Sequence, residues 1–298
     1  MRAVVTGGAG FIGSNLTREL LNLGHRVTVV DNFHTGSREN LRGLDAQVME
    51  ASCRKIGELG LRSDVVFHLG IPSSSPMYRR NPYLVGEAIN DMLAVLEYVK
   101  GENAKLVFAS SSSLYNGLPP PHRENMEVKV TDYYTECRLT VERLAELYAV
   151  LHGVQAVALR FFSVYGPQER AKGQYANVVT QFLWDLKEGR QPIIYGDGTQ
   201  TRDFTYVTDV VEACLLAWMK PFQFEVFNVG TGRSTSFNEV VELLNKALGT
   251  DIKPRFIPNP VATYVPATQA DTAKARGKLG FTAQVTLEEG IARLIASY

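Results

Sequence analysis

Short hydrophobic runs alternate with longer stretches of helical periodicity through the first half of the chain. The runs are rich in Val, Leu and Phe, contain few polar residues, and occupy positions 2–6, 26–31, 64–70, 104–112 and 154–162. Stretches with the apolar spacing of amphipathic helices separate them, at 12–24, 85–100 and 137–153. Strands that lack a polar face belong in a parallel sheet that is covered on both sides. The pattern therefore predicts an α/β fold with a doubly wound parallel sheet.

The rhythm changes after Phe162, where loop and turn residues become frequent. A helical pattern over 178–189 is followed by a cluster of turn formers, and strand and helix patterns then return over about 204–231. Two amphipathic helices are predicted in the remaining tail. We expect one domain over 1–162, rejoined by about 204–231, and a smaller C-terminal α/β domain within 163–298.

Charge and composition limit the kinds of molecule that this protein is expected to bind. Lys plus Arg and Asp plus Glu number 31 each, so no net charge favours nucleic acid or an acidic membrane surface. Three scattered cysteines are too few for a disulfide framework or a metal cluster. No signal peptide is evident, and the apolar runs fall short of the ~20 residues that span a bilayer. We expect a cytoplasmic protein with no metal, nucleic-acid or membrane partner.

A glycine-rich turn follows the first predicted strand. Gly7, Gly10 and Gly13 precede a helix, where glycines allow a tight turn and close approach of the backbone to a pyrophosphate at the helix N-terminus. Asp31 ends the second strand, where a carboxylate accepts hydrogen bonds from an adenosine ribose and repels a 2′-phosphate. The spacing indicates a Rossmann-type site for NAD rather than NADP. Three ordinary turn glycines and an exposed aspartate are the alternative.

Tyr134 and Arg138 are four residues apart in the stretch "TDYYTECRLT", so a helix would place both on one face. A free tyrosine titrates near ~10 and is a poor base at neutral pH unless a cation favours its phenolate. At about 5 Å and an effective dielectric constant near 20, one positive charge is worth roughly 3 kcal/mol, or about two pKa units. Tyr133 has no such partner. The alternative is an aromatic helix start with a solvated arginine.

The ordered set of motifs resembles the extended short-chain dehydrogenase/reductase family, in its nucleotide-sugar epimerase and dehydratase branch, and is most similar to UDP-glucose (UDP-galactose) 4-epimerases. The resemblance covers essentially the whole chain. The motifs that support it are "VTGGAGFIGSNL", "VVDNF", "DVVFHLG", "FASSSSLY", "YTECR", "RFFSVYGP", "YGDGTQTRDFTYVTDVV" and "FNVGTG".

The resemblance implies an N-terminal NAD-binding domain, a smaller domain that holds a nucleoside-diphosphate sugar, and a catalytic group of Tyr134, Ser111 and Arg138. Arg138 stands where the family has lysine, which is expected to disturb the cofactor ribose contact more than the activation of tyrosine. The cofactor residues implied are Gly7, Gly10, Phe11, Ile12, Gly13, Asp31, Asn32, Leu69, Tyr134 and Arg138. The substrate residues implied are Ser111, Ser112, Tyr134, Ser163, Asn177, Val178, Tyr195 and Arg202.

Two departures from the family pattern bear on ligand binding. Ser163 replaces an asparagine that contacts the diphosphate in many relatives, and the aspartate that usually approaches adenine is missing from "VMEASCRK". Ser112 and Ser113 occupy the places where dehydratases carry an acid pair, so dehydration is disfavoured.

We therefore expect a UDP-sugar 4-epimerase that acts through a 4-keto intermediate. Another UDP-sugar enzyme of the family (a decarboxylase, reductase or dehydratase) and a non-catalytic binding protein remain alternatives. The resemblance also implies a homodimer, with 85–99 and 137–151 as candidate interface helices.

Overall fold

Seven parallel strands form the central sheet of the computed structural model, which describes residues 1–259 and 264–298. Their spatial order is β11-β6-β5-β4-β1-β2-β3, so the chain reverses direction across the sheet between β1 and β4. This order confirms the predicted doubly wound arrangement. The strands are β1 (Arg2–Thr6), β2 (Arg26–Asp31), β3 (Gln47–Glu50), β4 (Val65–His68), β5 (Lys105–Ser111), β6 (Ala156–Phe161) and β11 (Phe224–Val229).

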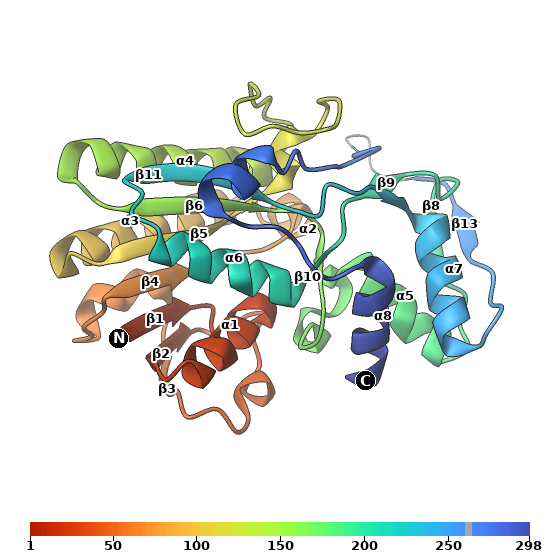
Figure 1. The fold of residues 1–298 in the computed structure, drawn as a ribbon, viewed down its shortest axis with the longest axis horizontal. Coiled ribbons are helices and arrows are strands. Elements are labelled where there is room, and N and C mark those ends of the chain that lie inside the picture. The colour runs from red at the N-terminus through yellow and green to blue at the C-terminus, as the bar shows by residue number, and fades with distance from the viewer. Residues whose placement is uncertain (260–263) are drawn as a thin grey trace.

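Helices cover both faces of the sheet, as the unbroken apolar strands require. Every residue of β4, β5 and β6 is buried. Helices α1 (Phe11–Asn22) and α6 (Val207–Met219) pack on one face, and α3 (Leu84–Glu102) and α4 (Tyr133–His152) pack on the other (Figure 1). The short helix α2 (Ser75–Arg80) lies near the start of α4.

Local sequence signals fix both ends of α4. The Asp132 carboxylate accepts a hydrogen bond from the Thr135 amide, and Thr135 Oγ1 accepts one from the Asp132 amide, which is a capping box. Gly153 ends the helix with φ of 71°, a left-handed conformation that favours glycine. With its start fixed, the helix buries Tyr134 and leaves the Tyr133 side chain 54% exposed.

The chain leaves the sheet after β6 and later returns to it. On its return α6 packs against α1, and β11 pairs in parallel with β6. Besides the cores on the two faces of the sheet, a further hydrophobic core lies beside it, formed mainly by the elements on the right of Figure 1. The division into an NAD-binding and a substrate-binding domain stays a prediction. The elements of this second part are α5 (Val178–Lys187), α7 (Phe237–Leu248), α8 (Leu287–Ala296), and the paired strands β7 (Val164–Tyr165) with β10 (Thr205–Tyr206), β8 (Ile193–Tyr195) with β13 (Arg255–Ile257), and β9 (Thr201–Arg202) with β12 (Thr235–Ser236).

Within residues 1–259 and 264–298, no helix is long and apolar enough to cross a membrane.

Candidate active site at the carboxyl ends of the strands

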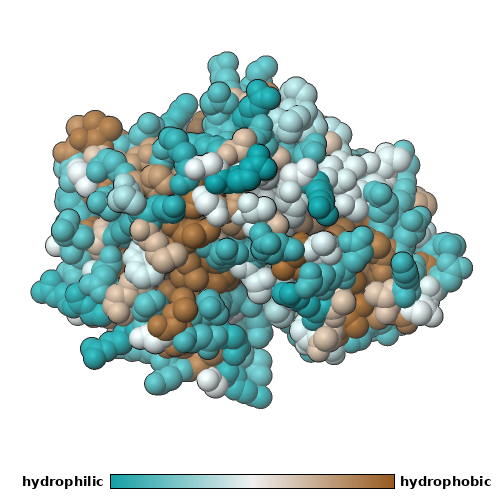
Figure 2. Space-filling view, in the orientation of Figure 1, coloured by the Kyte–Doolittle hydropathy of each residue, from teal (hydrophilic) through white to brown (hydrophobic). Residues whose placement is uncertain are grey.

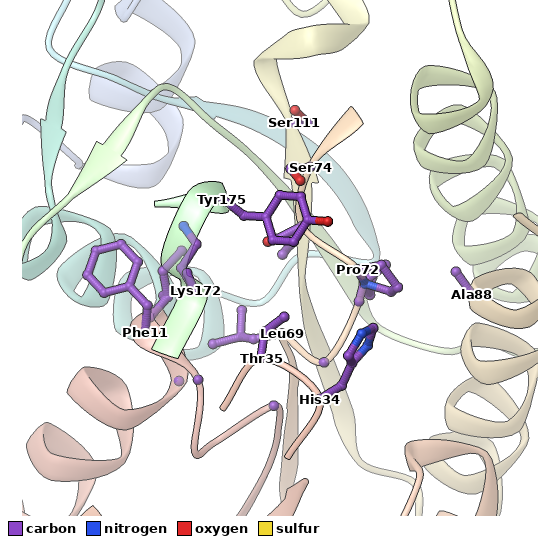
Figure 3. Close-up of a pocket in the computed structure, with 18 of the residues that line it drawn as sticks. Phe11, His34, Thr35, Leu69, Pro72, Ser74, Ala88, Ser111, Lys172 and Tyr175 are labelled. Atoms are coloured by element: carbon purple, nitrogen blue, oxygen red, sulfur yellow. The ribbon is translucent and has the colours of Figure 1, made fainter. Parts of the chain in front are cut away.

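A cavity of about 590 Å³ opens at the carboxyl ends of β1, β2, β4, β5 and β6. Ligands of open α/β sheets bind at this edge, where the strand order reverses. Figure 3 shows Ser111 and Ser74 at one end of the cavity and His34 and Thr35 at the other. Most of the predicted site residues line it: Gly7, Gly10, Phe11, Ile12, Gly13, Asp31, Asn32, Leu69, Ser111, Ser112, Tyr134, Arg138, Ser163 and Asn177.

The glycine-rich turn leaves no room for side chains. Gly7 has φ of 68°, and a Cβ added there would lie 2.6 Å from the backbone of Gly70. A Cβ on Gly13 would lie 2.1 Å from the carbonyl oxygen of Gly7. The backbone is therefore bare at the N-terminus of α1, as close approach of a pyrophosphate requires.

Asp31 lies beside this turn, and its carboxylate is held by the backbone. Its Oδ2 accepts a hydrogen bond from the Ala9 amide at 2.9 Å, and its Oδ1 accepts one from the Phe33 amide at 2.7 Å. Burial raises the pKa of Asp31 above its ordinary value, although these amides oppose the shift. Each carboxylate oxygen keeps a further lone pair for ribose hydroxyls. The turn and the acid together fit an NAD molecule.

Arg138 lies beneath the Tyr134 ring and is buried, with 3% of its surface exposed. Its Cζ is 5.0 Å from the ring centroid of Tyr134. Nη1 donates to the Ala109 carbonyl at 2.9 Å, and Nη2 donates to the Pro72 carbonyl at 3.1 Å. Burial favours a lower pKa for Arg138, but the phenols of Tyr134 and Tyr78 raise it, so the guanidinium stays charged.

Ser111 is the last residue of β5, and Ser112 comes directly after it. Ser111 Oγ accepts a hydrogen bond from the Ser113 amide at 3.1 Å and thereby caps the short helix η3 (Ser112–Tyr115). The Ser111 hydroxyl proton is not used in that bond, so it is available to a ligand. Both serines are buried and line the cavity.

A buried ion pair supports this strand end from behind. Arg160 Nη2 donates to Glu142 Oε2 at 2.6 Å, and their side chains are 5% and 6% exposed. Glu142 Oε1 also accepts from the Ser110 hydroxyl, next to Ser111. Arg160 Nη1 donates to the Tyr115 hydroxyl at 2.8 Å. The network ties β5, α4, β6 and η3 together beneath the reactive serine.

Lys172 brings a second cation to the cavity wall, and its position was not predicted from the sequence. It lies in the short helix η4 (Arg170–Tyr175), with Nζ 5.2 Å from the Phe11 ring centroid and 3.0 Å from Glu169 Oε1 (Figure 3). Glu169 is fully buried and also accepts from the Asn177 amide and the Thr180 hydroxyl. In the sequence, the one sign of this position is that Lys172 lies in a glycine-containing loop after β6.

Three predicted substrate residues do not line this cavity: Val178, Tyr195 and Arg202. Arg202 lies on β9 between two rings, with Cζ 5.5 Å from the centroid of Phe237 and 5.4 Å from that of Tyr264. Neighbouring Asp203 does not pair with it, because that carboxylate accepts hydrogen bonds from the amides of three residues, namely Thr231, Gly232 and Ala270. Roles for these three residues stay predictions.

Comparison with known proteins yields a consistent set of relatives. Residues 3–230 match the sequence model of the NAD dependent epimerase/dehydratase family. A UDP-N-acetyl-alpha-D-glucosaminuronate decarboxylase of Bacillus cytotoxicus is 32% identical, over 99% of this chain and 96% of the relative. The UDP-glucose 4-epimerase of Thermotoga maritima, solved with UDP-glucose, superposes with a TM-score of 0.93 at 34% identity, covering 100% of this chain and 98% of that one. The Thermus thermophilus UDP-glucose 4-epimerase, solved with NAD, gives a TM-score of 0.91 at 28% identity, covering 100% and 98%.

Proposed function

The chain belongs to the NAD-dependent epimerase/dehydratase family and uses NAD, and on this basis we propose that it epimerises a UDP-sugar at C4, most simply UDP-galactose and UDP-glucose. The observation that carries the proposal is the convergence of Tyr134, Arg138 and Ser111 on one cavity with the glycine turn. The turn at Gly7, Gly10 and Gly13 would hold the pyrophosphate, and Asp31 the adenosine ribose. NAD, when bound, supplies the hydride transfer.

The side chains supply proton transfer and placement. Tyr134, as phenolate, takes the proton from the C4 hydroxyl of the sugar and returns it after the 4-keto sugar has turned over. The Ser111 hydroxyl donates to the same sugar oxygen and orients it. Arg138 places a buried positive charge against the ring of this tyrosine, with Cζ 5.0 Å from the ring centroid. These roles need no further acid or base.

Dehydration finds no support at this site. It would require a general acid and base next to Ser111 to expel a hydroxyl and remove a carbon-bound proton. Ser112 and Ser113 follow instead. Among the described residues that line the cavity, the carboxylates come from β2 and α3 and not from the β5 end: Asp31, Glu87 and Asp91.

A second candidate is a UDP-uronate enzyme, which the Lys172 cation favours. A uronate has a carboxylate on C5, and Lys172, which pairs with Glu169 at 3.0 Å, adds a positive charge to the cavity wall. Relatives at 32% identity include the UDP-glucuronic acid decarboxylase 1 of Arabidopsis thaliana, which this chain covers to 70% of its length. Epimerisation without loss of carboxylate and decarboxylation with release of carbon dioxide would then be distinguished by their products.

The test is a product assay with the full chain loaded with NAD. UDP-galactose, UDP-glucose, UDP-N-acetylglucosamine and UDP-glucuronate are incubated separately, and the products are separated by chromatography. We expect interconversion of the first two. Single-turnover absorbance checks for transient NADH. A chain that holds NAD but yields neither a transient nor a product with any of the four would contradict the proposal and favour a non-catalytic binding protein.

We also propose a homodimer formed through α3 and α4. These helices pack side by side, and the C-terminal half of α4 exposes apolar side chains, with Leu147 48%, Val150 77% and Leu151 62% accessible. Figure 2 shows hydrophobic surface at the upper left, over this end of α4. Light scattering with size-exclusion chromatography should give twice the monomer mass, and Val150→Glu should reduce it.

A further inference from the structure

A carboxylate lines the cavity at a position that the roles above leave unexplained. Asp91 lies on α3, three residues after Ala88, so the two share one face of the helix, and Figure 3 shows Ala88 directed at the cavity. Asp91 is half-buried and interacts electrostatically with Cys53, which lies on the short helix η2 (Cys53–Glu58). The Cys53 thiol donates to the Gly70 carbonyl, with Sγ 3.7 Å from the oxygen.

Cys53 and Asp91 can be located in the cavity relative to Asp31, the carboxylate that we expect to bind the ribose. The Ala51 amide donates to the Asp31 carbonyl at 3.1 Å, so Ala51 borders the ribose site. Cys53 is two residues further on, and Asp91 faces it from α3. A dinucleotide that has its pyrophosphate at α1 and a ribose on Asp31 extends its base in the direction away from α1. Ala51, Cys53 and Asp91 line the cavity on this side and would border the base.

The hydrogen-bonding groups of Asp91 and Cys53 distinguish adenine from hypoxanthine. An ionised carboxylate only accepts hydrogen bonds, and a thiol donates one. The Cys53 thiol donates to the Gly70 carbonyl, so the Asp91 carboxylate keeps its lone pairs for a donor on the ligand. Adenine presents an amino group at its edge, whereas hypoxanthine presents a carbonyl oxygen at the same place. A half-buried carboxylate would leave that carbonyl unpaired and repelled.

We propose that Asp91, which lines the cavity beside Cys53, selects the adenine base of the cofactor by accepting a hydrogen bond from its exocyclic amino group. The role concerns the dinucleotide alone, so it does not depend on which sugar nucleotide is the substrate. The 48–55 stretch has no aspartate, and its one acid, Glu50, pairs with Arg38 on the surface, so in this proposal the acid that reads adenine comes from α3. Burial raises the pKa of Asp91, while the Cys53 thiol and the Arg54 charge oppose the shift.

The test compares NAD with nicotinamide hypoxanthine dinucleotide, in which a carbonyl oxygen replaces the exocyclic amino group and ring N1 carries a proton. Isothermal titration calorimetry on the full chain, freed of bound nucleotide, gives both dissociation constants for the wild type, Asp91→Asn and Glu87→Gln. The Asn side chain can turn its amide nitrogen toward a carbonyl, so Asp91→Asn should lose selectivity. Glu87→Gln is the matched control, because Glu87 is an exposed acid on the same helix face and carries the same charge.

We expect the wild type to bind NAD about tenfold or more tightly than the hypoxanthine analogue, as loss of a hydrogen bond to a charged group implies. Asp91→Asn should bring the ratio close to one, and Glu87→Gln should keep it. Equal affinities in the wild type, or an unchanged ratio in Asp91→Asn, would overturn the inference while leaving the proposed epimerase intact. A wild type that binds neither dinucleotide would overturn both. Because the wild-type ratio is itself diagnostic, the test stands even if a variant fails to fold.

Discussion

Arg138 holds its guanidinium carbon 5.0 Å from the centroid of the Tyr134 ring, within a pocket that excludes solvent from the arginine. Both terminal nitrogens are engaged by main-chain carbonyls, those of Ala109 and Pro72. An arginine whose terminal nitrogens are bonded to the backbone faces the tyrosine ring as a fixed positive charge. Its rigidity also fixes the distance between charge and phenol.

Replacing the proposed base should slow turnover strongly without loss of the cofactor. We expect Tyr134→Phe to lower kcat by about 10²–10⁴-fold, because a positioned general base contributes about that much. Tyr133→Phe is the matched control, since Tyr133 is its exposed neighbour on α4. NAD affinity, measured by calorimetry, should stay within about threefold in both variants. Full activity in Tyr134→Phe would exclude the tyrosine as base.

Arg138→Lys and Arg138→Met separate charge from hydrogen bonding. The methionine variant loses a charge worth roughly 3 kcal/mol and should be about a hundredfold slower. It also leaves the Ala109 and Pro72 carbonyls unpaired, so its free energy of unfolding should fall by about 2 kcal/mol or more. The lysine variant keeps the charge and should stay within about tenfold of the wild type in kcat. Activity confined to the lysine variant would mark the natural arginine as an impairment.

Glu142→Gln tests the network behind β5. Removing one partner of a buried ion pair leaves the Arg160 charge uncompensated, so we expect a loss of about 3–5 kcal/mol in the free energy of unfolding, measured in urea. Glu289→Gln is the control: its partner Arg293 is 47% exposed, and the loss there should be about 0.5 kcal/mol or less. Similar losses in the two variants would contradict a supporting role for the Glu142 network.

Cofactor affinity should depend on the ionisation of Asp31. The charged carboxylate accepts ribose hydrogen bonds, so the bound state has the lower pKa, and binding below the pKa of the free chain expels a proton. Because burial raises that pKa, NAD affinity should be constant near neutrality and fall with acidification earlier than for an ordinary aspartate. Calorimetry between about pH 5 and pH 8 checks this, with circular dichroism to confirm folding. Asp31→Asn should bind NAD more weakly at pH 7, and its affinity should no longer fall with acidification in this way. If the wild type and Asp31→Asn gave parallel pH profiles, Asp31 would not be the group responsible.

Arg202 should act on the sugar nucleotide and not on the dinucleotide. It lies on β9, away from the cavity that Asp31 and the glycine turn line. If its guanidinium binds the substrate diphosphate, Arg202→Ala should raise KM about tenfold or more, with little change in NAD affinity. Arg255→Ala, an exposed arginine on β13, should leave both unchanged. An unaltered KM in Arg202→Ala would remove it from the substrate site.

The sequence by itself determined the features that depend on local spacing. Apolar runs without polar faces required a sheet covered on both sides, the glycines required a turn that side chains would block, and the capping residues Asp132 and Gly153 fixed α4 so that Tyr134 faces inward. Each of these follows from interactions within a few residues along the chain.

Only the tertiary structure decided which distant groups meet. Arg138 reaches carbonyls 29 and 66 residues away, and Asp91 meets Cys53 across two different elements. Lys172 enters the cavity because buried Glu169 holds its loop. No periodicity encodes such contacts, since they depend on how α3, η2 and η4 pack around the strand ends. The sequence thus determined where the cofactor turn and the tyrosine lie, and packing decided which charges surround them.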